Sequence, residues 1–127
     1  GGFTDNMLDG TFGVACQLLE TGKTLQAIQT CGYLMLVDPY NGRYYQLAGI
    51  SLQRMQNYEV AEYFYRMADV FDKGNPVTQV YRGECKIMSG ETDAGLEFVR
   101  SGVEAARNDR ELAEIVQRGE VLIKQFG

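Results

Sequence analysis

The residue types that could do chemistry are few in this chain, and their spacing does not assemble a catalytic set. There is no histidine, which removes the commonest general base and the commonest metal ligand. Glu59 and Glu62 lie at helical spacing, but an exposed helix face routinely carries such a carboxylate pair. We therefore expect no enzyme activity, no metal site and no cofactor.

The cysteines are also poorly placed for chemistry. Cys16, Cys31 and Cys85 are an odd number at wide spacing, which is neither a disulfide framework nor a zinc pattern. Reduced thiols in a cytosolic protein are the expected state. We expect Cys16 in particular to act as a small apolar group rather than as a reactive thiol.

Length and charge restrict the class of partner. The chain has 127 residues and a net charge of -5, which opposes nucleic acid because phosphate binding needs a basic stripe. This charge fits a cationic or mainly apolar partner, and solubility alone could also explain it. No apolar stretch approaches the roughly 18 residues of a membrane span, and residues 1–13 lack the pattern of a signal peptide. We predict one cytoplasmic domain over residues 1–127, without membrane insertion.

A self-match at a spacing of 34 residues indicates the elements that must position a binding site. Residues 22–27 (GKTLQA) recur as 56–61 (QNYEVA) and again as 90–95 (GETDAG). A period of 34 is that of the tetratricopeptide repeat, whose unit is a pair of helices joined by a turn. Arrays of this kind act as curved binding surfaces.

Small residues recur where the helices of such a repeat cross. Ala48-Gly49 and Ala61 hold these positions in the second copy, and Gly83, Gly95 and Gly102 hold them in the third. Glycine inside a helix costs about 1 kcal/mol relative to alanine, so close helix contact is what these sites are expected to require. A looser match to the repeat is the alternative for the third copy.

The predicted fold class is all-α, with three tandem tetratricopeptide helix-turn-helix repeats and a C-terminal capping helix in a right-handed superhelical array. The repeats are predicted at about residues 8–41, 42–75 and 76–108, with helices at 8–21, 25–37, 43–55, 58–72, 77–89 and 92–106. A terminal helix must cover the last exposed face of such an array. The predicted capping helix, 109–126, has an apolar face made by Leu112, Ile115, Val116, Leu122, Ile123 and Phe126.

The second repeat resembles a known family. Residues 38–49 (DPYNGRYYQLAG) are similar to the repeat junction of class II type III secretion chaperones, which bind translocator subunits. Tyr63-Phe64-Tyr65, followed by Asp69 or Asp72, resembles the family's aromatic helix in the same repeat. Gly83-Glu84-Cys85 with Gly90-Glu91 resembles its third repeat. The similarity covers about residues 18–106, and residues 38–49 are its most specific part.

The resemblance implies a bacterial cytosolic chaperone that holds a hydrophobic, pore-forming translocator subunit before export. The partner's extended apolar segment would lie in the groove made by the first helix of each repeat. Family members usually have a longer helical N-terminal segment used in dimerisation, and little precedes residue 8 here, so a homodimer and a heterodimer both stay open. A needle-subunit chaperone, an export-apparatus cochaperone or a general tetratricopeptide adaptor or scaffold is the alternative.

The peptide-binding groove is predicted on the first helix of each repeat, at positions not used for packing. Aromatic and aliphatic groups would take side chains of an extended peptide, while amide and guanidinium groups would satisfy its backbone. For Tyr40, Tyr44 and Ile50, a place in the core is an equal alternative, and Arg43 could be a solvated surface residue. The predicted groove residues are Phe12, Cys16, Leu19, Tyr40, Arg43, Tyr44, Gln46, Ile50, Gln53, Val80, Tyr81, Glu84 and Ile87.

Overall fold

The regular structure of the described part of the chain is all helical. The computed structural model describes residues 4–127; residues 1–3, which belong to the predicted domain, lie outside this part. Residues 4–127 contain seven α-helices, one short 3₁₀-helix and no strand, which confirms the all-α prediction. The elements are α1 (Asp5–Glu20), α2 (Thr24–Val37), α3 (Gly42–Arg54), α4 (Tyr58–Phe71), α5 (Pro76–Met88), α6 (Thr92–Ala106), η1 (Arg110–Leu112) and α7 (Ala113–Phe126).

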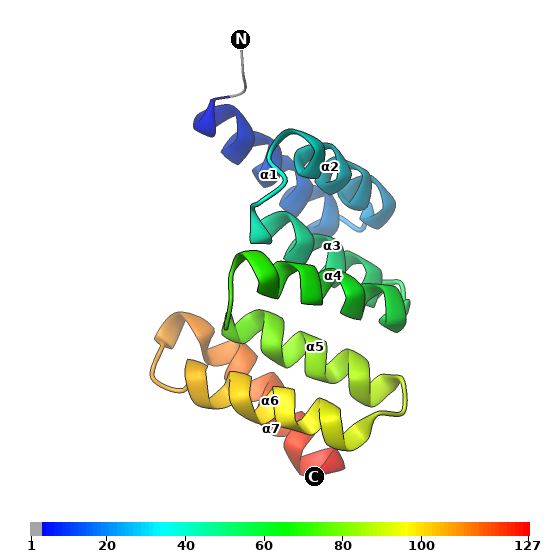
Figure 1. Cartoon of the computed structure of the whole chain (residues 1–127), viewed down its shortest axis with the longest axis vertical. Helices are drawn as coiled ribbons and strands as arrows, with labels where there is room; N and C mark the ends of the chain where they lie inside the picture. Colours follow the sequence, from blue (N-terminus) through cyan, green and yellow to red (C-terminus); the bar gives the residue numbers. More distant parts are fainter. Residues whose placement is uncertain (1–3) are drawn as a thin grey trace.

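The helices stack one after another along an elongated body, with α1 and α7 at opposite ends (Figure 1). Each helix packs on the next in the chain, and α7 packs on α6 and also contacts α5. The first helices of successive hairpins also touch, since α1 contacts α3 and α3 contacts α5. This stacking of helical hairpins under a terminal helix is the tetratricopeptide architecture that the repeat predicted.

The helix predictions differ from the structure mainly at two ends. Helix α1 begins at Asp5 rather than 8, because the Thr4 hydroxyl accepts a hydrogen bond from the Met7 backbone N–H at 3.1 Å and so caps the helix three residues earlier. Helix α7 begins at Ala113 rather than 109, because η1 precedes it. The repeat boundaries themselves stay a prediction.

One turn position repeats through the three hairpins. Gly22, Gln56 and Gly90 stand 34 residues apart and have φ values of 82°, 62° and 92°. Each lies between the two helices of its hairpin, where the chain needs a left-handed residue. Glycine adopts this conformation freely, whereas Gln56 is strained there, because an L side chain crowds the following carbonyl.

The expected close contacts between helices are present. A Cβ built on Gly49 would lie 2.6 Å from the Tyr65 ring, and a Cβ on Gly83 would lie 2.5 Å from the Gly95 carbonyl oxygen. A Cβ on Gly102 would lie 2.9 Å from the Pro76 carbonyl oxygen. Real side chains essentially never come so close, so these positions admit only glycine unless the Tyr65 ring or the neighbouring backbone shifts.

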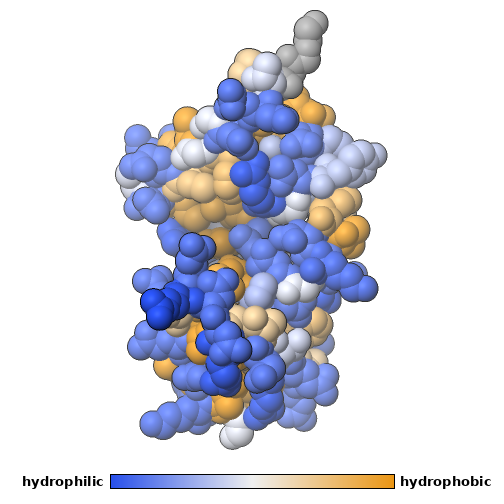
Figure 2. Space-filling model, turned by 90° about the vertical axis from the view of Figure 1, so that its left-hand side faces the viewer, coloured by the Kyte–Doolittle hydropathy of each residue, from blue (hydrophilic) through white to orange (hydrophobic). Residues whose placement is uncertain are grey.

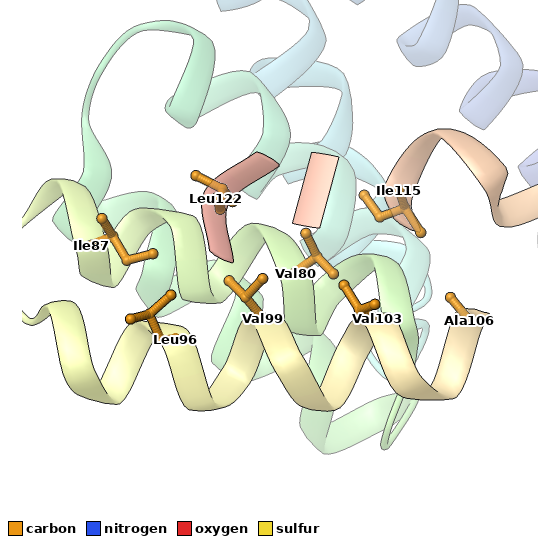
Figure 3. Close-up of a cluster of buried hydrophobic side chains, with 8 residues drawn as sticks. All are labelled: Val80, Ile87, Leu96, Val99, Val103, Ala106, Ile115 and Leu122. Carbon is orange, nitrogen blue, oxygen red and sulfur yellow. The ribbon is translucent and has the colours of Figure 1, made fainter. Parts of the chain in front are cut away.

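The apolar core is divided along the array rather than gathered in one place. One cluster centres on α1, α2 and α3, a second on α3, α4 and α5, and a third on α5, α6 and α7. In the third cluster, Ile115 and Leu122 of α7 close over Val80, Val99 and Val103 (Figure 3). Helix α7 therefore covers the last hairpin, as the sequence predicts for a capping helix.

Candidate functional site

The first helices of the hairpins and α7 together form one face of the array, here called the inner face. Residues of α3, α5 and α7 line a common pocket, and residues of α5 and α7 line two more. The 34-residue period brings the same position of each helix onto this face. Cys16, Ile50, Glu84 and Arg118 form one such row, and the first three of them are half-buried.

A chain of hydrogen bonds runs across the middle of the inner face. The Tyr65 hydroxyl donates to Gln53 Oε1 at 2.8 Å, and the Gln53 amide donates in turn to Glu84 Oε1. Arg118 Nε and Nη2 donate to the same Glu84 oxygen at 3.0 and 2.8 Å. Residues from α4, α3, α5 and α7 are thus joined in one network, which holds the Glu84 carboxylate and the Arg118 guanidinium in fixed places.

Aromatic rings lie against this network. The Tyr65 and Tyr81 rings are stacked, with centroids 6.0 Å apart and an interplanar angle of 14°. The Arg118 guanidinium lies 5.2 Å from the Tyr81 ring centroid, within the range of a cation–π interaction. Burial raises the pKa of Tyr65 far above its ordinary value, so its hydroxyl keeps its proton and remains a donor to Gln53.

The N-terminal part of the inner face is held by Arg43. Its Nη2 donates to Asp9 Oδ1 at 2.9 Å, and its guanidinium lies 4.8 Å from the Phe12 ring centroid. Asp9 and Arg43 are 34 residues apart, as are Glu84 and Arg118. Two guanidinium–carboxylate pairs at equivalent spacing therefore join helices of the inner face, one between α1 and α3 and one between α5 and α7.

Between α3, α5 and α7 lies a pocket of about 240 Å³, here called the central pocket. Its lining combines apolar side chains with hydrogen-bond donors, and the Glu84 side chain is its single carboxylate. A neighbouring hollow between α5 and α7, here called the acidic pocket, is lined by Glu111 and Glu114 together with Tyr81 and Arg118. The central pocket is lined by Ile50, Gln53, Arg54, Tyr58, Tyr81, Glu84, Met88 and Arg118.

Several predicted groove residues lie on the inner face with accessible side chains. Ile50, Gln53, Tyr81 and Glu84 meet in the central pocket. Gln46 bridges α3 and α5, where its amide donates to the Thr78 hydroxyl at 2.9 Å. At the N-terminal end, the half-buried residues are Phe12 and Cys16, and Arg43 is exposed.

Four predicted groove residues are buried, which corrects the expectation that a peptide could touch them. Leu19 is 4% exposed, Val80 0% and Ile87 6%, because each packs into a core cluster. Tyr44 is 0% exposed, and its hydroxyl donates to Asp38 Oδ2 at 2.8 Å. Tyr44 therefore belongs to the interior between the first two hairpins.

Tyr40 is exposed but is not part of the central pocket. It lies in the turn between α2 and α3, and its ring meets the Phe71 ring of α4 edge-on, with centroids 5.7 Å apart. Phe71 also contacts Tyr45 at a centroid distance of 5.2 Å. Tyr40 thus joins an aromatic cluster at the helix ends, apart from Ile50, Tyr81 and Glu84.

Sequence reasoning missed four residues of the central pocket: Arg54, Tyr58, Met88 and Arg118. A signal for Arg118 was present, because it stands 34 residues after Glu84. The apolar pattern of residues 109–126 predicts only a capping helix and does not place Arg118 in the 34-residue row. Tyr58 has no comparable signal in the sequence, since it begins the second helix of its hairpin.

The thiols show no sign of activation. Burial raises the pKa of Cys31 to about 12 and the pKa of Cys85 to about 12. Burial, with a smaller contribution from the Glu20 charge, also raises the pKa of Cys16. A nucleophilic cysteine needs a lowered pKa. Among residues 4–127, no group of three or more cysteine, aspartate and glutamate residues is close enough to hold a metal ion.

The surface of the array is mixed. Seen from the side, apolar surface shows between polar groups in the half that contains the N-terminal hairpins, whereas polar side chains cover most of the C-terminal half in this view (Figure 2). None of the helices in residues 4–127 has the length and hydropathy needed to cross a membrane.

No protein-family model matches this chain, and no curated protein matches it. Solved structures do match. The Yersinia enterocolitica type III secretion chaperone SycD, in complex with a peptide of the translocator YopD, aligns with a TM-score of 0.88 at 22% identity, over 97% of this chain and 94% of that chain. PcrH from Pseudomonas aeruginosa aligns with a TM-score of 0.89 at 20% identity, over 98% and 95% of the two chains.

PcrH in complex with the chaperone-binding region of PopD aligns equally well, with a TM-score of 0.89 at 20% identity, over 98% of this chain and 94% of that chain. The alignments extend over nearly the whole of each chain. This chain therefore has the fold of these secretion chaperones.

Proposed function

We propose that this protein is a cytosolic chaperone of a bacterial type III secretion system, which holds an extended, apolar segment of a translocator subunit against the inner face. The observation that carries the proposal is the inner face itself. It presents half-buried apolar groups and fixed hydrogen-bond donors side by side, on a fold shared with chaperones whose solved complexes contain translocator segments. The role is binding and not catalysis.

The inner face has the chemistry that an extended segment needs. Phe12, Ile50 and Tyr81 are half-buried, so each offers apolar surface that a partner side chain can cover at little cost in desolvation. Arg43, whose guanidinium is fixed by Asp9 at 2.9 Å, can donate to backbone carbonyl groups of the segment. Main-chain hydrogen bonds with apolar contacts at intervals are a recurrent mode of peptide recognition.

The residues proposed to touch the segment are those predicted groove residues that remain accessible. The buried ones, Leu19, Tyr44, Val80 and Ile87, shape the floor beneath them. Tyr40 stands apart on the α4 side and is not included. The proposed contact residues are Phe12, Cys16, Arg43, Gln46, Ile50, Gln53, Tyr81 and Glu84.

A second candidate function is a general adaptor that docks a folded partner on the second helices of the hairpins. Large apolar side chains are exposed there: Leu36 is 83% exposed, Val70 68% and Tyr63 53%. Exposed apolar groups in such number mark interaction surfaces when they are contiguous. The two functions differ in the face that they use, so substitutions on each face distinguish them.

The test is co-expression with a type III translocator subunit, followed by co-purification. We expect Ile50→Glu to reduce the captured translocator at least tenfold, because a carboxylate in an apolar contact must be desolvated. Val70→Glu on α4 is the matched control and should leave capture unchanged. Loss of capture with Val70→Glu and not with Ile50→Glu would support the adaptor instead.

Each variant must be checked for folding by a thermal melt. Ile50 also packs against two core clusters, so only a variant with a cooperative transition near the wild-type midpoint is informative. A charged substitution at Tyr44, such as Tyr44→Glu, does not test capture. Because Tyr44 is 0% exposed, a charge there should unfold the first two hairpins rather than act on binding.

A further inference from the structure

We propose that the central pocket accepts an acidic side chain of the bound segment, and that Arg54 and Arg118 select it. The inference rests on the proposed function, since it needs a peptide on the inner face. It adds a chemical preference at one place: a carboxylate between α3, α5 and α7, within a segment that is otherwise apolar.

The charge of the central pocket is opposite to that of the chain. Two guanidinium groups, from Arg54 and Arg118, and one carboxylate, from Glu84, line it. The whole chain carries a net charge of -5. A local excess of positive charge in an acidic protein attracts an anionic group to that place and repels it from the surroundings.

The single carboxylate is already engaged. Glu84 Oε1 accepts hydrogen bonds from Gln53 and from Nε and Nη2 of Arg118, and the Glu84 side chain is only 13% exposed. Glu84 and Arg118 therefore compensate one another. Because its charge is balanced by Arg118, Glu84 does not neutralise the Arg54 guanidinium.

Arg54 has no anionic partner among residues 4–127. Its Nη1 donates to the Leu19 carbonyl oxygen at 3.3 Å, which fixes the guanidinium on a neutral acceptor. No carboxylate of these residues forms a salt bridge with it. A guanidinium presents five N–H donors, so most of its hydrogen-bonding capacity remains available to a ligand in the central pocket.

The other polar groups of the pocket also favour an acceptor. The Tyr58 and Tyr81 side chains line it and carry hydroxyl groups that can donate. At about 240 Å³, the pocket is smaller than the roughly 300–1,000 Å³ of small-molecule sites. Its size thus fits one side chain of a peptide better than a whole cofactor or metabolite.

The neighbouring acidic pocket disfavours an acidic side chain, so it restricts the preferred place for one to the central pocket. Glu111 and Glu114 line it, with Arg118 as its single guanidinium. A carboxylate displaced from the central pocket toward α7 would meet two like charges. The inner face therefore distinguishes positions along the segment by the sign of the charge that each position tolerates.

The probe is a set of fluorescein-labelled twelve-residue peptides with a fixed frame of leucine, valine and serine. One position at a time carries Asp, Asn or Lys, and binding is measured by fluorescence anisotropy at low salt. At the favoured position, we expect the Asp peptide to bind roughly tenfold more tightly than the Asn peptide, the equivalent of about 1.4 kcal/mol. The Lys peptide should bind more weakly than both.

Arg54→Gln should abolish the preference for Asp over Asn, because Asn can still accept hydrogen bonds but carries no charge. Arg66→Gln is the matched control. It removes the same charge from α4, and Arg66 is 58% exposed and lies outside the central pocket. Arg118→Gln should also reduce the preference, but it releases Glu84 as well, so Arg54→Gln is the deciding variant.

The two proposals fail in different ways. If none of the peptides binds, including the one with an unmodified apolar frame, the proposed function is wrong for such segments. If the apolar peptide binds but Asp and Asn are equivalent at every position, the acidic preference is wrong. An Asp preference that survives Arg54→Gln, or that Arg66→Gln removes equally, would also overturn it.

Discussion

The two ends of the array use glycine in opposite ways. In the third hairpin, a Cβ on Gly83 would lie 2.5 Å from the Gly95 carbonyl oxygen, and a Cβ on Gly95 would lie 2.6 Å from the Gly83 carbonyl oxygen. In the first hairpin, a Cβ on Gly10 or Gly13 would meet nothing within 4 Å. The same residue type therefore marks a tight contact at one end and open surface at the other.

The difference indicates that stability is unevenly distributed along the array. In the third hairpin, the cost of glycine inside a helix is offset by the close packing of α5 against α6. Helix α7 packs over this pair and adds to their apolar core. In the first hairpin, the penalty of about 1 kcal/mol per glycine has no such compensation within the described residues. Repeat proteins sum the stabilities of their units, so we expect the N-terminal hairpin to open first.

The largest effect is expected for Gly83→Ala. The added methyl group would lie 2.5 Å from the Gly95 oxygen and 2.9 Å from the Val99 nitrogen, and both are backbone atoms that cannot rotate away. Overpacking costs roughly 1–3 kcal/mol, and we expect a loss of unfolding free energy at the upper end of this range. Urea denaturation followed by circular dichroism measures it.

Gly95→Ala should behave in the same way, because the contact is reciprocal. The double variant should cost less than the sum of the two single changes, since either methyl group already forces α5 and α6 apart. An unchanged urea midpoint for Gly83→Ala would mean that the two helices are not in close contact in solution.

A second, smaller effect concerns a row of buried positions that differs between the hairpins. Cys31, Tyr65 and Val99 stand 34 residues apart and are all 0% exposed. Burial raises the pKa of Cys31 from its ordinary value of 9.0 to about 12. The stability that comes from burying the neutral Cys31 thiol is therefore fully present below pH 9. It is lost as the pH rises from 9 toward 12, because the thiol ionises in the unfolded chain before it ionises in the folded one.

At pH 10.5, Cys31 ionisation in the unfolded chain should lower the unfolding free energy by about 2 kcal/mol. Cys31→Val places in the first hairpin the residue type that the third hairpin has at the same position. We expect this variant to lose less stability between pH 8 and pH 10.5 than the parent, in reducing buffer. If the parent and Cys31→Val lost the same unfolding free energy between pH 8 and pH 10.5, the ionisation of Cys31 would not contribute to the pH dependence of stability.

The 34-residue period explains why so much of the fold was predictable. Gly22 and Gly90 mark the turns, and Ala48-Gly49, Gly83 and Gly95 mark the helix crossings, because these backbone positions admit few residue types. The burial of individual side chains on the inner face was less predictable. Tyr44 and Ile50 lie on the same helix, and the sequence alone did not indicate which of them the preceding hairpin would cover.

The central pocket was only partly predictable for a related reason. Ile50, Gln53, Tyr81 and Glu84 follow from their places on the first helices, whereas Arg118 reaches the pocket from the terminal helix. A terminal helix has an apolar face for the core, and that face dominates its sequence pattern. The guanidinium at its edge becomes informative only when Glu84 and Arg118 are placed in the same 34-residue row.

The smallest effect, and the one with the opposite sign, is expected for Gly13→Ala. Gly13 lies inside α1, its Cβ would meet nothing within 4 Å, and its φ is not in the left-handed region. Alanine there should restrict the unfolded chain and raise the unfolding free energy by about 0.4–1 kcal/mol. The matched control is Gly22→Ala, because its Cβ would also meet open space but its φ is 82°, so it should destabilise. If Gly13→Ala were destabilising as well, another chain or a second copy would have to approach α1 closely at this point, and the melting temperature of the parent would then rise with protein concentration.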